Sequence, residues 1–145
     1  MRRKILALVL SISIIAAPAY AGRVFDELCA AVEEVEDEED LLQLNGIEER
    51  YKGKFVRGSG YVKKAEDVWG DVVIYASTGI NIIRSVEEED EDTVSFSGAD
   101  LKIYVQRKFY DQALKFKEGQ KVYFFGAFRD IAKKTIIIRN ATLAE

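Results

Sequence analysis

The chain has 145 residues, of which 21 are basic, 25 are acidic and none is histidine. Without histidine, Ser-His-Asp and Cys-His catalysis are excluded, and a zinc site would need one cysteine joined by carboxylates alone. No phosphate-binding or dinucleotide-binding glycine motif occurs. We therefore predict that the protein is not an enzyme and has no catalytic residue, metal site or cofactor.

The first 21 residues have the layout of a secretory signal peptide. The basic start MRRK precedes the apolar run ILALVLSISIIAA, and small Ala19 and Ala21 provide a cleavage site before Gly22. This run is shorter than the roughly 20 residues that cross a membrane, and an uncleaved N-terminal anchor is the alternative. We predict a signal peptide at residues 1–21 and a periplasmic or secreted bacterial protein without a membrane span after cleavage.

Residues 22–50 form a predicted acidic helical segment with eleven acidic residues and two basic ones. Apolar residues recur at three- and four-residue steps, as in an amphipathic helix, at Phe25, Leu28, Val32 and Val35. The acids continue to Asp40, where the helix macrodipole disfavours them, so we expect a weak or broken helix end there. Asn45-Gly46 then predicts an interruption before a short turn. We interpret Cys29 as an apolar helix residue, with intermolecular pairing as the alternative.

From Tyr51 onward the hydrophobic period changes to two, which is typical of strands. We predict five strands, at residues 54–64, 71–77, 101–107, 121–129 and 134–140. The pattern further predicts one or two helical turns at 108–116 and a long connection at 78–100. That connection contains the acidic run 87–92, which lacks the glycine and the distal glutamate of an EF-hand and which we interpret as a solvated loop. Five strands with a helix between the third and the fourth indicate a mainly β domain at 51–145, an OB-fold Greek-key barrel.

The first predicted strand carries glycines on its apolar face. Val56, Gly58, Gly60 and Val62 share that face, because side chains alternate along a strand. Glycine inside a strand marks a bulge, a bend or a close approach of the backbone. We therefore expect Gly58 and Gly60 to let the strand coil around the barrel.

Three stretches resemble a known family: DLLQLNGIEERYKGKFVRGSGYV, LKFKEGQKVYFFGAF and IIIRNATL. They are similar to the opening, the fourth strand and the closing strand of the bacterial exported OB-fold proteins named for their likeness to tRNA anticodon-binding domains. The resemblance covers about residues 40–143 and implies the fold and export, but no activity. The chain departs from the family at Gly58, in the long acidic connection and in lacking a lipoprotein acylation motif.

Aromatic and basic side chains are predicted to share the outer surface of the barrel. By alternation the outward rings are those of Phe55, Tyr61, Tyr75, Tyr104, Tyr123 and Phe125. They are interleaved with or flanked by Lys63, Lys102, Arg107, Lys121 and Arg129. Rings among bases offer stacking and phosphate neutralisation to single-stranded nucleic acid, and the same rings would serve an oligosaccharide. The hypothetical ligand-binding residues are Tyr75, Tyr104, Lys102, Arg107, Trp69 and Tyr123.

Two other interpretations of these rings remain at this point: some of them pack beneath the N-terminal helix, or they form a protein or peptide surface. We predict an exported, non-catalytic binding module of the bacterial envelope, whose partner is an unidentified envelope protein or ligand. The alternative is single-stranded nucleic-acid or oligosaccharide binding on the outer face of the second and third strands. We also expect the acidic helix or the acidic loop to lie over the basic aromatic face, because opposite charges attract over about 8 Å at physiological salt.

Overall fold

The computed structural model describes residues 19–84 and 92–144. Most of the predicted signal peptide and of the acidic run lies outside the described residues. Five strands form a closed barrel in the order β1-β2-β3-β5-β4, with β3 and β5 parallel and the other pairs antiparallel. The strands are β1 (Phe55–Val68), β2 (Asp71–Arg84), β3 (Asp92–Val105), β4 (Lys121–Ala132) and β5 (Thr135–Leu143). This is the predicted OB-fold.

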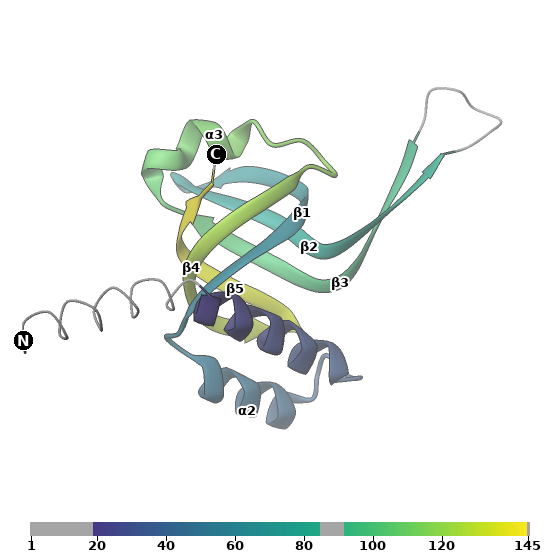
Figure 1. Ribbon diagram of the computed structural model, residues 1–145, viewed down its shortest axis with the longest axis vertical. Helices are drawn as coiled ribbons and strands as arrows, with labels where there is room; N and C mark the ends of the chain where they lie inside the picture. The colour runs from purple at the N-terminus through teal and green to yellow at the C-terminus, as the bar shows by residue number, and fades with distance from the viewer. Residues whose placement is uncertain (1–18, 85–91, 145) are drawn as a thin grey trace, which may run out of the picture.

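The helices lie at the two ends of the barrel (Figure 1). The N-terminal helix is described over residues 19–34, and α2 (Leu41–Tyr51) follows it at the same end. The short 3-10 helix η1 (Arg107–Phe109) and α3 (Tyr110–Leu114) connect β3 to β4 at the opposite end. None of the described helices combines the length and the apolar character needed to cross a membrane.

The acidic segment divides into two helices. The predicted break is confirmed, because the N-terminal helix ends at residue 34 and α2 begins at Leu41. The predicted interruption at Asn45-Gly46 is wrong, since both residues lie inside α2. The Asp40 side chain caps this helix by accepting a hydrogen bond from the Gln43 backbone N–H at 3.2 Å. Leu44 and Tyr51 are buried, so capping and burial outweigh the low helix propensity of Asn and Gly.

The N-terminal helix closes one end of the barrel with its apolar face. Val24, Phe25, Leu28 and Val32 are buried in the same core cluster as the inward side chains of the strands. The Phe25 ring meets Phe124 of β4 edge to face, with ring centroids 5.4 Å apart. A Cβ atom on Gly58 would lie 2.4 Å from the Phe25 ring, whereas one on Gly60 would lie 3.0 Å from Leu101 Cδ1. Gly58 therefore makes room for the helix, and Gly60 permits a close strand approach inside the barrel.

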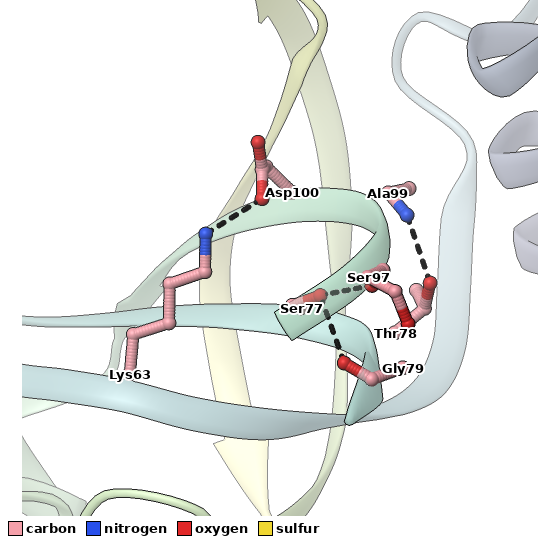
Figure 2. A network of polar contacts seen from close by, with 7 residues as sticks. All are labelled: Lys63, Ser77, Thr78, Gly79, Ser97, Ala99 and Asp100. Atoms are coloured by element: carbon pink, nitrogen blue, oxygen red, sulfur yellow. Dashed lines mark hydrogen bonds and ion pairs between the residues drawn. The ribbon is translucent and has the colours of Figure 1, made fainter. Parts of the chain in front are cut away.

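The connection predicted at residues 78–100 is largely strand, so that prediction is wrong. β2 and β3 continue beyond the barrel as a two-stranded arm, in which residues 79–84 pair with 92–97 (Figure 1). A register shift between Ser77 and Gly79 separates the arm from the barrel. At this shift the Ser77 hydroxyl donates to the Ser97 carbonyl, and Thr78 Oγ1 accepts from the Ala99 N–H at 2.9 Å (Figure 2). These side chains replace ladder hydrogen bonds that the irregular register cannot make.

Candidate nucleic-acid interface

Five side chains on the outside of the barrel alternate between cations and aromatic rings. Lys64 Nζ lies 4.8 Å from the centroid of the Tyr75 ring, and Lys102 Nζ lies 5.7 Å from the same centroid. Lys102 Nζ is also 5.3 Å from the Tyr104 ring, over which the Arg139 guanidinium stacks at 4.1 Å. These are cation–π distances. We call this series, formed by Lys64, Tyr75, Lys102, Tyr104 and Arg139, the ring–cation ladder.

Strand register brings the ladder together from four strands. Tyr75 of β2 pairs with Lys64 of β1 on one side and with Lys102 of β3 on the other. A bulge between Val62 and Lys64 shifts the alternation of β1 by one residue. Because of this shift Lys64 points outward, and Lys63 bonds Asp100 instead, with 2.7 Å between Nζ and Oδ1 (Figure 2). Arg139 comes from β5, which runs parallel to β3.

The ladder is half-buried and keeps its positive charge. Tyr75, Lys102, Tyr104 and Arg139 are all partly exposed. A hydrogen bond with the Tyr104 hydroxyl raises the pKa of Lys102, so this ammonium stays protonated throughout the physiological range. Partial burial raises the pKa of the Tyr75 hydroxyl, which keeps the ring neutral. One acid lies close, since Glu66 Oε2 is 3.7 Å from Lys64 Nζ. The ladder can therefore offer neutral rings and protonated cations to an anionic ligand.

A surface depression of about 540 Å³ adjoins the β3 end of the ladder. Tyr104 and Arg139 line it together with Arg107 and Lys108 from η1, and Asp71 is the acid among its lining residues. Gln106 fixes this corner, because its N–H donates to the Ala141 carbonyl at 2.9 Å and its Nε2 donates to the Asn140 carbonyl at 3.1 Å. The depression gathers three cations around one exposed edge of the ladder, which suits a phosphate or carboxylate group.

The structure brings four of the six sequence-predicted site residues together. Tyr75, Lys102 and Tyr104 belong to the ladder, and Arg107 lines the adjoining depression. Trp69 lies in the β1–β2 turn with φ 55° and is 99% exposed, without a described contact to the ladder. Tyr123 lies on β4, which pairs with β1 and β5 but not with β2 or β3.

Sequence reasoning missed two members of the ladder. Alternation along β5 from the outward Ile137 would have placed Arg139 on the outside, so its signal was present in the sequence. Strict alternation along β1 places Lys64 inward, and only the bulge reverses this. Within the described residues no group of three His, Cys, Asp or Glu side chains could hold a metal ion.

The N-terminal helix does not cover the ladder. Its buried residues pack into the end of the barrel, whereas Tyr75 and Tyr104 contact Lys64, Lys102 and Arg139. The interpretation that outer rings pack beneath the helix is therefore wrong for Tyr75 and Tyr104. The expectation that the acidic helix covers the basic aromatic face is also wrong, because its Glu33 lies beside Gly98 and the β4–β5 turn. The acidic run at 87–91 lies outside the described residues.

Comparison with known proteins identifies likenesses of fold. A candidate nucleic acid-binding lipoprotein from Klebsiella pneumoniae aligns with a TM-score of 0.45 and 12% identity, over 72% of this chain and 81% of that chain. A small single-stranded DNA-binding protein from Streptomyces coelicolor aligns with a TM-score of 0.42 and 11% identity, over 65% and 93% of the two chains. The SSB of Plasmodium falciparum in complex with ssDNA gives 0.34 and 16%, over 63% and 94%. No model of a known family and no curated protein sequence matches the chain, so the resemblance to the exported OB-fold family stays a prediction.

Proposed function

We propose that the protein is an exported, non-catalytic OB-fold module that binds single-stranded nucleic acid on the outer face of β2 and β3. The observation that carries the proposal is the ring–cation ladder. Single-strand binders combine a positively charged track for the phosphates with aromatic rings on which the bases stack. Here Lys102 lies between two rings, within 6 Å of both centroids. A strand crossing the ladder would meet ring and charge in turn.

The positive charges of the ladder favour an anionic polymer over a neutral oligosaccharide as the ligand. A neutral oligosaccharide would use the rings but would gain little from Lys64, Lys102 and Arg139. An anionic polymer would use both, and the depression beside Arg107 and Lys108 would hold a further anionic group. In the free protein the cations lie over the rings, so binding requires them to move aside toward the phosphates. The two lysines can make such movements at small cost because Lys64 is exposed and Lys102 is partly exposed.

Binding assays with matched variants test this proposal. Tyr75→Ala and Tyr104→Ala are expected to weaken binding of oligothymidine by about 1–3 kcal/mol for each stacked base. Tyr75→Phe keeps the ring and should bind like the original protein. Lys52→Ala, which removes an exposed base on the C-cap of α2, is the charge control. A chain that binds neither oligothymidine, single-stranded RNA nor heparin at low salt would contradict the proposal, and binding to heparin alone would favour an acidic oligosaccharide.

Export is supported by the sequence of residues 1–21. In this proposal the mature chain consists of the acidic helical segment 22–50 and the OB-fold domain 51–145. Ala21 is buried against the barrel, whereas Tyr20 is exposed, so cleavage between Ala21 and Gly22 removes one buried methyl group and leaves Val24 and Phe25 in place. The intact mass of the protein recovered from the periplasm or medium of an expressing bacterium should correspond to a chain beginning at Gly22. A mass that retains residues 1–21 would contradict cleavage.

A further inference from the structure

A second aromatic and basic surface lies on the outside of β1 and β4. We call it the β1–β4 face and define it by Phe55, Arg57, Tyr61, Lys121, Tyr123 and Phe125. Its rings are more open than those of the ladder, with 61% of Phe55, 53% of Tyr123 and 39% of Phe125 exposed. Phe55 and Phe125 stack with centroids 5.7 Å apart and planes 4° from parallel. A depression of about 620 Å³ beside them is lined by Arg57, Ser59 and Tyr123.

The charged side chains at the outward positions of this face are all basic. The outward positions of β1 between residues 55 and 61 and of β4 between 121 and 129 include no acidic residue. They carry Arg57, Lys121 and Arg129, of which Arg129 lies 3.9 Å from the neighbouring Asp130 carboxylate. Within the described residues neither Arg57 nor Lys121 forms an ion pair. Exposed rings beside unpaired cations favour an anionic partner with flat apolar groups, which is the chemistry of the ligand proposed for the ladder.

Strand β1 joins the two surfaces. Tyr61 pairs with Ser77 of β2 and with Lys121 of β4, because β1 bends from one wall of the barrel to the other. Lys121 Nζ lies 5.8 Å from the Tyr61 ring centroid and 5.2 Å from that of Tyr123. The alternation of ring and cation thus resumes on the same strand, three residues before Lys64. The cation–π contacts thus form two series, Arg139–Tyr104–Lys102–Tyr75–Lys64 and Tyr61–Lys121–Tyr123, and β1 carries the adjoining ends of both, Lys64 and Tyr61.

We propose that the β1–β4 face is a second contact region for the same single strand, which crosses β1 and continues over Tyr61, Lys121 and Tyr123. This inference rests on the proposed function of the ladder. It assigns to the barrel a ligand longer than the ladder alone can hold. One OB-fold binds about 4–16 nucleotides. We therefore expect an oligothymidine of about 4 nucleotides to contact the ladder alone, and one of about 12 nucleotides to reach the β1–β4 face as well.

The experiment compares the two lengths on two variants of the full mature chain. Tyr123→Ala and Lys121→Gln are expected to leave binding of the short oligothymidine unchanged and to weaken binding of the long one. Loss of one stacked base corresponds to about a 5- to 150-fold loss of affinity for Tyr123→Ala. Tyr123→Phe should restore affinity for the long oligothymidine, and the number of nucleotides covered per protein on poly(dT) should fall in Tyr123→Ala. Tyr123 is half-exposed, so an unchanged melting temperature verifies that the variant is folded.

Separate outcomes distinguish this inference from the proposed function. If Tyr75→Ala weakens both lengths while Tyr123→Ala and Lys121→Gln weaken neither, the track ends at β1 and the inference is overturned while the ladder stands. Equal weakening of both lengths by Tyr123→Ala would also overturn it, because the short oligothymidine would then reach β4. If the original protein binds neither length, the proposed function fails first. Capture of a protein partner that Tyr123→Ala abolishes, with oligothymidine binding unaffected, would make the face a protein dock instead.

Discussion

Replacing Gly58 by alanine should overpack the contact between the N-terminal helix and the barrel. The added Cβ would lie 2.4 Å from two atoms of the Phe25 ring, which is closer than real Cβ contacts allow. The ring is buried against Phe124, so it cannot move aside without losing that contact. Overpacking of this kind costs about 1–3 kcal/mol of unfolding free energy. We expect Gly58→Ala to lower the free energy of unfolding by that amount.

A double-mutant cycle isolates the clash from other effects of the substitution. Phe25→Ala alone should cost about 3–5 kcal/mol because it leaves a cavity in the core. In the Phe25→Ala background the new methyl group enters this cavity, so Gly58→Ala should cost little or should stabilise the protein. The coupling energy expected for two residues in contact is about 0.5–3 kcal/mol. Urea unfolding of the four proteins, followed by far-ultraviolet circular dichroism, measures each term.

Gly46→Ala is the matched control for this cycle. Gly46 lies inside α2, and a Cβ built on it meets no atom within 4 Å. Because glycine costs a helix interior about 0.5–1 kcal/mol relative to alanine, this substitution should stabilise the protein. Equal costs of Gly58→Ala with and without the Phe25 ring would refute the claim that Gly58 makes room for Phe25.

Three further predictions follow from single contacts. Gly60→Val should lower the free energy of unfolding by about 1–3 kcal/mol, because a side chain there meets Leu101, and an unchanged melting temperature would contradict this. Burial raises the pKa of the Cys29 thiol to about 12, so iodoacetamide at pH 8 should alkylate it in urea but not in the folded protein. Hydrogen bonds from Tyr110 and from the Gly70 N–H lower the pKa of Asp67. The stability that Asp67 contributes should be present above the unfolded pKa of about 3.9 and be lost as the pH falls through the lower folded value, and Asp67→Asn should abolish that part of the pH dependence in acid unfolding.

The barrel was predictable because long stretches of its strands obey simple alternation. β4 buries every second residue from Val122 to Phe128, and this pattern is visible in the sequence. The arm was not predictable in the same way. The register shift at Ser77–Gly79 interrupts the alternation, and side-chain hydrogen bonds from Ser77 and Thr78 hold the strands together where the pattern fails.

The structural role of Gly58 depends on its contact with the Phe25 ring, which the sequence around Gly58 does not reveal. Phe25 lies 33 positions earlier in the chain, and only the packed helix shows that the two residues meet. The same limit applies to the ladder. Tyr75, Lys102 and Tyr104 follow from alternation, whereas Lys64 joins them because a bulge of one residue turns it outward. Alternation along a strand thus predicts which side chains share one side of the sheet. A bulge shifts this assignment by one residue, and the sequence pattern does not show it.

The salt dependence of oligothymidine binding tests the central claim most directly. Each phosphate neutralised on a single strand contributes about −0.7 to the slope of log affinity against log salt. If Lys102 and Arg139 each neutralise one phosphate, the double substitution Lys102→Gln and Arg139→Gln should make the slope shallower by about 1.4. The same change at the control residue Lys52 should leave the slope unaltered. A slope that is the same in the double variant as in the original protein would show that the ring–cation ladder does not hold the strand.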